Sequence, residues 1–208
     1  WPGARWTTHR NAIKPVPAQI FTQAAIQCAE QLYQDGLRLD EMASLTVRSH
    51  EGCCGRVQGS PQAFVPATRE AADHSTPFVV AMVLRDGFLA ESSYRGEPWL
   101  NDDLRAKMAT MQLVIDPEWD HRIQEDGLIG AEISATDRSG REYHAAVRQF
   151  AGHPDNPLSD DGLATKLTSL LDEPGIQGEG AGRRLLKTCL AIGGAPDVTS
   201  LVAACRTA

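Results

Sequence analysis

The stretch that decides the fold is "PATREAADHSTPFVVAMVLRDG", residues 66–87. Thr68 and Ser75 are residue types that cap helix N-termini, a proline suits the first turn, and a glycine lies just past the end. The run that follows Ser75 is apolar on nearly every helical face. It therefore predicts a helix buried at the centre of the fold.

The same stretch places an acid, an imidazole and a hydroxyl side by side, as Asp73, His74 and Ser75. Consecutive side chains on a helix point about 100° apart, so these three do not converge on one reacting atom. We interpret them as a capping cluster, in which Asp73 and Ser75 accept backbone N–H bonds. The open alternative is that one of them, or the helix N-terminus, faces an anionic ligand.

Upstream, apolar residues recur at helical spacing as far as Leu32, which predicts a long helix with Pro17 in its first turn and Gly36 as its C-terminal cap. Alternation in "SLTVRSH" predicts a half-buried strand. Residues 51–66 carry glycines and prolines without periodicity, and we expect a long loop there.

Downstream, the patterns predict further strands and helices. "LIGAEISAT" and "REYHAAVRQF" flank the turn "DRSG", which is typical of a β-hairpin with glycine at positive φ. "MQLVIDP" predicts a strand stopped by Pro117. The expected helices are Asp102–Thr110, Leu163–Leu171, Ala181–Ile192 and Val198–Cys205.

These elements indicate an α+β fold, because helices and strands do not alternate regularly and the clear hairpin is antiparallel. We expect a small, mostly antiparallel sheet of about four strands with packed helices, followed by a helical C-terminal tail. The predicted division is an α+β domain over residues 1–152 and closing helices over residues 153–208.

Composition excludes several classes of protein. The net charge of −7 and pI near 5.3 argue against general nucleic-acid binding. The longest apolar run, Phe78–Leu84, is too short to span a membrane. Five scattered cysteines, with Cys53 and Cys54 adjacent in the expected loop, favour a reducing cytoplasm over a disulfide framework or a zinc site.

Candidate chemistry is sparse. Lys14 in "NAIKPVPAQ" lies between stretches of stiff backbone and can present a fixed positive charge to a carboxylate; the alternative is an ordinary exposed lysine. Gln19 can add a hydrogen bond or simply be solvated. His50 ends a strand, where side chains are more often structural than functional. The residues alone predict an α+β domain able to bind an anion.

Three segments together resemble one family. They are "IKPVPAQIFTQAAIQCAEQL", "PATREAADHSTPFVVAMVLRDG" and "GHPDNPLSDDGLATKL". In this order and spacing they are similar to the second domain of the MmgE/PrpD family, which includes 2-methylcitrate dehydratases. The last two segments are fairly specific to that family.

The resemblance implies an architecture. Family members are about twice this length, with a large helical domain first, a smaller α+β lid domain next, and C-terminal helices that return to the helical body. This chain resembles the lid and the returning helices, and Trp1, with no initiator methionine, falls near the domain junction. The family also implies a homodimer.

The resemblance further implies proton transfer next to a carboxylate of a small polycarboxylic acid, with no metal, iron–sulfur cluster or other cofactor. It makes Lys14 the catalytic lysine of the lid and Gln19, Arg69 and His74 substrate-binding residues, with Arg56 a further possible cation. Glutamine at position 19 is closer to dehydratase-like members than to cis-aconitate decarboxylases, which carry histidine. Phe21 departs from a histidine that is common at its position.

The expected function is thus one part of a metal-independent hydro-lyase, which most simply dehydrates 2-methylcitrate or a related tricarboxylate. Epimerase or decarboxylase chemistry on the same fold stays open. A non-catalytic docking module, or a split subunit that binds a helical partner, is the alternative from another class.

Overall fold

The computed structural model describes residues 10–171 and 176–206. The chain divides into two compact units, Trp1–Asn156 and Pro157–Ala208. The first unit contains the elements α1 (Gln23–Gln34), β1 (Met42–Ser49), α2 (Glu51–Cys54), α3 (Arg69–Asp73), α4 (Thr76–Asp86), α5 (Asp102–Met108), β2 (Met111–Ile115), α6 (Pro117–Asp126), β3 (Ala131–Asp137) and β4 (Glu142–Val147). The second contains α7 (Asp160–Leu171), α8 (Ala181–Ala191) and α9 (Thr199–Cys205).

The four strands form one mixed sheet in the order β2-β1-β3-β4. β1 is parallel to β2 and antiparallel to β3, and β3 and β4 form the predicted hairpin. Gly140 in the hairpin turn has φ +87°, a left-handed conformation that glycine adopts at little cost. The mostly antiparallel α+β fold is confirmed.

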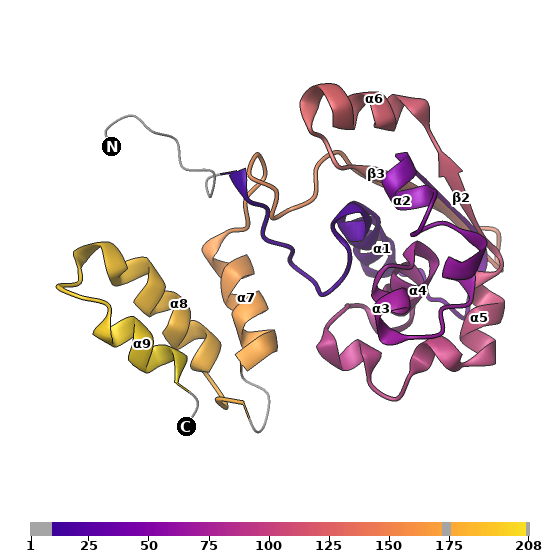
Figure 1. The fold of residues 1–208 in the computed structure, drawn as a ribbon. Coiled ribbons are helices and arrows are strands. Elements are labelled where there is room, and N and C mark those ends of the chain that lie inside the picture. The colour runs from indigo at the N-terminus through magenta and orange to yellow at the C-terminus, as the bar shows by residue number, and fades with distance from the viewer. Residues whose placement is uncertain (1–9, 172–175, 207–208) are drawn as a thin grey trace. The chain divides into compact units, whose positions relative to one another are not determined.

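The core of the first unit lies around α1 and α4. Every residue of α4 from Thr76 to Leu84 is buried. α1 contacts β3 and β4 as well as α4, so it lies between the sheet and the buried helix (Figure 1). Burial of a large apolar side chain contributes about 1.5–3 kcal/mol, and α4 supplies several of them.

Thr68 and Ser75, the two alternative caps for one expected helix, each cap a helix of their own. The side-chain oxygen of Thr68 accepts a 3.1 Å hydrogen bond from the N–H of Ala71 and begins α3. Ser75 accepts one of 3.1 Å from Phe78 and begins α4. The stretch forms two helices instead of one, because the chain turns at His74 between them.

Two expectations for this unit were wrong, and one helix was not predicted. The first helix begins at Gln23, because Pro17 belongs to an extended turn that leads into a short 3-10 helix. The expected loop over residues 51–66 contains α2 and a second 3-10 helix, and Cys53 and Cys54 are buried in α2. α6 was missed because its residues are almost all polar, so no apolar stripe is visible.

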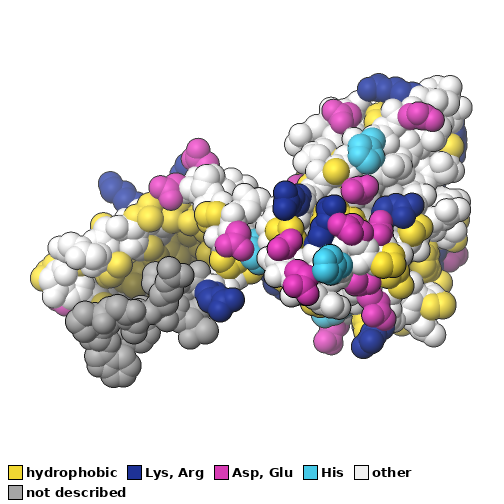
Figure 2. All heavy atoms as spheres, turned by 90° about the horizontal axis from the view of Figure 1, so that it is seen from above, with side chains coloured by type: hydrophobic (Ala, Val, Ile, Leu, Met, Phe, Trp, Pro, Cys, Tyr) yellow, Lys and Arg dark blue, Asp and Glu magenta, His cyan; other side chains and the backbone are white. Residues whose placement is uncertain are grey.

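The second unit is a group of three helices whose predicted positions are confirmed within a few residues. Gly182 of α8 lies against α7 so closely that a Cβ atom there would be 2.4 Å from the backbone nitrogen of Thr168. Hydrophobic side chains remain exposed on this unit (Figure 2). They are Leu170, Ile176, Leu190, Val198 and Val202. Packing of these helices on a helical domain stays a prediction.

No helix in the described parts of the chain is long and apolar enough to cross a membrane.

Candidate functional site

A surface hollow of about 580 Å³ opens on the first unit, where the turn before α1 meets the junction of α3 and α4. Polar side chains from both segments line it, together with Glu91 of the 3-10 helix that follows α4. They are Lys14, Gln19, Arg69, Asp73, His74 and Glu91. The expected catalytic lysine and the three expected substrate-binding residues therefore line one hollow, although they lie far apart in sequence.

The turn before α1 is fixed from inside the protein. The buried amide nitrogen of Gln23 donates to the carbonyl oxygens of Val16, Ala18 and Gln19 at 3.1–3.3 Å. The backbone N–H of Gln19 donates to the carbonyl oxygen of Asp73 at 3.0 Å, which joins the turn to the end of α3. The side chains that precede α1 are therefore held at the edge of the hollow.

Lys14 is the exposed cation of this turn. The preceding residue, Ile13, is anchored by its N–H to the carbonyl oxygen of Gly152 at 2.7 Å, and Pro15 stiffens the chain on the other side. Among the described residues, the Lys14 ammonium has no ion-pair partner. Its charge is thus available to an anion in the hollow.

The side-chain amide of Gln19 uses its oxygen within the protein and leaves its NH₂ group for a ligand. The side-chain oxygen accepts a hydrogen bond from the backbone N–H of Phe21. Within the described part of the chain the side-chain NH₂ group makes no hydrogen bond, so it is left to donate to a ligand oxygen.

Arg69 is already engaged by two carboxylates. Its guanidinium donates to Asp73 at 2.6 Å and to Glu91 at 2.7 Å, and it lies 4.6 Å over the ring of Tyr94. The hydrogen bond to Glu91 is the main cause that raises the pKa of Arg69. The two carboxylates balance the formal charges of Arg69 and Lys14, so the hollow is not the cationic cleft that a polycarboxylate would favour.

Asp73 and His74 do touch, unlike neighbours within a helix. His74 is the C-terminal cap of α3, with φ −98° and ψ 3°, and its Nδ1 contacts both Asp73 Oδ1 and the carbonyl oxygen of Glu70. The expectation that Asp73 caps a helix was therefore wrong, because its carboxylate binds Arg69 and His74 instead. Ser75 points into the core and donates to the Ala63 carbonyl oxygen at 2.6 Å, so no triad forms.

Comparison with known proteins identifies the family. The sequence profile of the MmgE/PrpD C-terminal domain matches residues 16–192. The chain belongs to the MmgE/PrpD family. It is 27% identical over 147 residues to "2-methylcitrate dehydratase" of Salmonella typhimurium (strain LT2) and, equally, to that of Salmonella typhi. Each match covers 66% of this chain and 29% of the relative, so the chain spans less than a third of the length of these relatives.

Phe21, at the position where MmgE/PrpD resemblance led us to expect a histidine, packs on a histidine instead. Its ring meets that of His50 edge-on, with centroids 5.1 Å apart. His50 is only 1% exposed, and burial lowers its pKa despite the opposing effect of Asp120. An imidazole so buried does not line the hollow, and no sequence motif indicates its pairing with Phe21.

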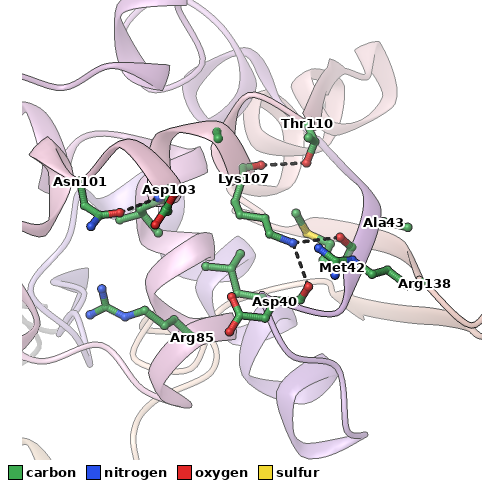
Figure 3. Close-up of a pocket in the computed structure, with 12 residues that line it drawn as sticks. Asp40, Met42, Ala43, Arg85, Asn101, Asp103, Lys107, Thr110 and Arg138 are labelled. Carbon is green, nitrogen blue, oxygen red and sulfur yellow. Dashed lines mark hydrogen bonds between the residues drawn. The ribbon is translucent and has the colours of Figure 1, made fainter.

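A second hollow of about 790 Å³ lies between α5 and the start of β1 (Figure 3). Lys107 reaches across it and donates to the carbonyl oxygens of Asp40, at 2.9 Å, and Met42, at 3.4 Å. Burial and the nearby Arg138 lower the pKa of Lys107. Its ammonium is used to hold the chain before β1 against α5, and none of the family-implied residues lies there.

Arg56, the further cation considered from sequence, does not line the first hollow. Its side chain is exposed and pairs with Glu51 at 2.8 Å.

Proposed function

We propose that this chain is the lid-type part of a hydro-lyase that acts on a small polycarboxylate. Dehydration of 2-methylcitrate or a related tricarboxylic acid is the favoured reaction. One observation carries the proposal: Lys14, Gln19, Arg69 and His74 line a single hollow in a chain of the MmgE/PrpD family. The curated relatives named 2-methylcitrate dehydratase support the choice of substrate.

The proposed reaction has requirements that these residues can meet in part. A dehydratase must hold several carboxylates, remove a proton from carbon and return one to the departing hydroxyl. The Lys14 ammonium supplies a positive charge for a carboxylate, and the Gln19 NH₂ group supplies a hydrogen-bond donor. Arg69 binds substrate only if its pairing with Asp73 or Glu91 opens.

The charge balance of the hollow supports the proposal that a second protein surface completes the site. Its cations and carboxylates cancel in formal charge, whereas a tricarboxylate needs an excess of positive charge. We therefore propose that a helical domain faces the hollow and supplies further cations and acid–base groups. A metal-independent reaction, a homodimer and a cytoplasmic location belong to the same proposal, the last supported by five free cysteines.

A substrate panel tests the proposal. The complete gene product is incubated with 2-methylcitrate, citrate, cis-aconitate and iminodisuccinate, and the products are separated by chromatography. We expect loss of water from 2-methylcitrate or a related tricarboxylate. Released carbon dioxide or an inverted stereocentre as the main outcome would replace dehydration by decarboxylase or epimerase chemistry. Failure with every polycarboxylate would contradict the proposal.

A second candidate, a docking module or split subunit without catalysis of its own, is favoured by the apolar side chains exposed on α8 and α9. Two observations separate the candidates. A helical domain encoded in frame upstream favours one enzyme chain, whereas a stop codon there favours a split subunit. We expect the isolated chain to have little activity, because half of the proposed cleft would be missing, and normal turnover by the chain alone would contradict this.

A further inference from the structure

Two oxygen acceptors contact the same ring nitrogen of His74 and so orient its imidazole. Nδ1 lies 2.9 Å from the carbonyl oxygen of Glu70 and also contacts Asp73 Oδ1. A carbonyl oxygen and an ionised carboxylate carry no proton to donate, so the shared hydrogen belongs to Nδ1. In the neutral ring the opposite nitrogen, Nε2, is then the acceptor.

The carboxylate of Asp73 is itself fixed. Its Oδ2 accepts a 2.6 Å hydrogen bond from Arg69, whose second nitrogen binds Glu91 at 2.7 Å. The Asp73 side chain is only 15% exposed, so the two partners on its two oxygens leave it little freedom. Glu91, Arg69, Asp73 and His74 thus form a continuous chain of hydrogen bonds that ends at the imidazole.

The free edge of the ring is accessible. His74 lines the hollow together with Lys14 and Gln19, and 39% of its side chain is exposed. Nε2 makes no hydrogen bond to any residue in the described part of the chain. A residue with an unpaired acceptor nitrogen therefore lines the same hollow as the cation and the amide donor that we propose for substrate binding.

We propose that His74 is a proton-transfer residue of this lid and that Asp73 is its positioning residue, with Arg69 holding Asp73. This inference rests on the proposed function and changes two roles within it. His74 acts on the reacting atoms instead of only binding substrate, and Arg69 acts through Asp73 instead of on the ligand. It also places an imidazole in the lid, although Phe21 stands where a histidine was expected.

The step can be written in balanced form. The lone pair of His74 Nε2 takes a proton from the carbon next to a substrate carboxylate. The electrons of that C–H bond form the C=C bond as the C–O bond to the hydroxyl group breaks. The departing oxygen takes the proton back from Nε2 and leaves as water. The enzyme ends unchanged, and the Asp73 carboxylate stabilises the imidazolium while it exists.

A purely structural role for His74 makes different predictions. In that case the ring only closes α3 through Nδ1, and any side chain with a donor at that place would serve. His74→Asn retains an amide nitrogen near the position of Nδ1, whereas His74→Gln places one nearer Nε2. Neither amide can accept and return a proton at neutral pH, so the two roles can be separated.

The first arm of the test uses the complete gene product. We expect His74→Asn and His74→Gln both to lower kcat by about 10²-fold or more, with a smaller change in KM. Added imidazole should restore part of the activity of His74→Ala. Circular dichroism and thermal melting confirm folding of each variant. Wild-type kcat in folded His74→Asn would overturn the inference.

The second arm does not depend on turnover. In the chain labelled with ¹⁵N-histidine, long-range ¹H–¹⁵N correlation spectra at pH 8.5 report which ring nitrogen is protonated. We expect the Nδ1–H tautomer for His74 and a shift toward Nε2–H in Asp73→Ala. An Nε2–H tautomer in the wild-type chain would overturn the inference. If no polycarboxylate is turned over, the proposed function fails and this arm alone decides the tautomer and the role of Asp73.

Discussion

The hydroxyl group of Tyr94 donates a 2.7 Å hydrogen bond to the carbonyl oxygen of Pro17. The same ring lies beneath the guanidinium of Arg69. Tyr94 therefore braces both sides of the hollow, namely the turn that carries Lys14 and the helix that carries Arg69. Residues distant in sequence form one site because such bonds join the two segments.

Tyr94→Phe tests this brace. The variant keeps the ring under Arg69 but leaves the Pro17 carbonyl without its donor, and we expect a loss of about 1 kcal/mol in the free energy of unfolding. A rise in KM should accompany it, since the turn before α1 is loosened. Tyr143→Phe is the matched control, because that hydroxyl binds Asp137 at the hairpin. Equal effects of the two variants on KM would argue against a brace.

Ser75→Ala should destabilise the chain more than Thr68→Ala. Ser75 is fully buried and both caps α4 and donates to the Ala63 carbonyl oxygen, so its loss leaves two buried backbone groups unpaired. We expect the free energy of unfolding to fall by about 2 kcal/mol in Ser75→Ala. In Thr68→Ala, which removes an exposed cap, it should fall by about 1 kcal/mol or less. Urea unfolding followed by circular dichroism measures both, and the reverse order would be inconsistent with this assignment.

The burial of Glu30 predicts how stability changes with pH. Burial raises the pKa of Glu30 from 4.5 to about 7. The folded state therefore keeps a proton that the unfolded state loses, and stability falls as the pH rises from about 4.5 to 7. Glu30→Gln should raise the free energy of unfolding by about 2–3 kcal/mol at pH 8 and change it little at pH 4. The exposed Glu125→Gln is the control, and a pH-independent effect of Glu30→Gln would refute this explanation.

Gly182→Ala tests the close packing of α7 and α8. Alanine is favoured over glycine in a helix by about 1 kcal/mol, but here its Cβ would collide with the backbone of Thr168. We expect net destabilisation of about 1–3 kcal/mol. Gly193 has nothing within 4 Å of an added Cβ, so Gly193→Ala should be nearly neutral. Stabilisation by Gly182→Ala would mean that the two helices do not approach so closely.

Sequence predicted those elements whose signals are local. The cap at Ser75, the glycine at 87 and the hairpin glycine at 140 each fix a backbone conformation within a few residues. α6 was missed although it has an Asp116 cap and a glycine after its end, because Trp119 is its one buried residue and periodicity is weak.

The sequence singled out individual residues of the candidate site, but it did not predict how they are arranged in space. Family resemblance singled out Lys14 and His74, yet nothing local indicates that they share a hollow. That follows from tertiary bonds such as Gln19 N–H to the Asp73 carbonyl oxygen. The pairing of Arg69 with two carboxylates likewise depends on Glu91, which no sequence motif connects to it.

The central claim is that this hollow binds and transforms a small polycarboxylate, and Lys14 tests it most directly. The measurement is kcat/KM for 2-methylcitrate in the complete gene product, compared among wild type, Lys14→Ala and Arg48→Ala, a cation on the sheet outside the hollow. We predict a fall of about 10²-fold or more for Lys14→Ala and wild-type activity for Arg48→Ala. Unchanged kcat/KM in folded Lys14→Ala would contradict the account.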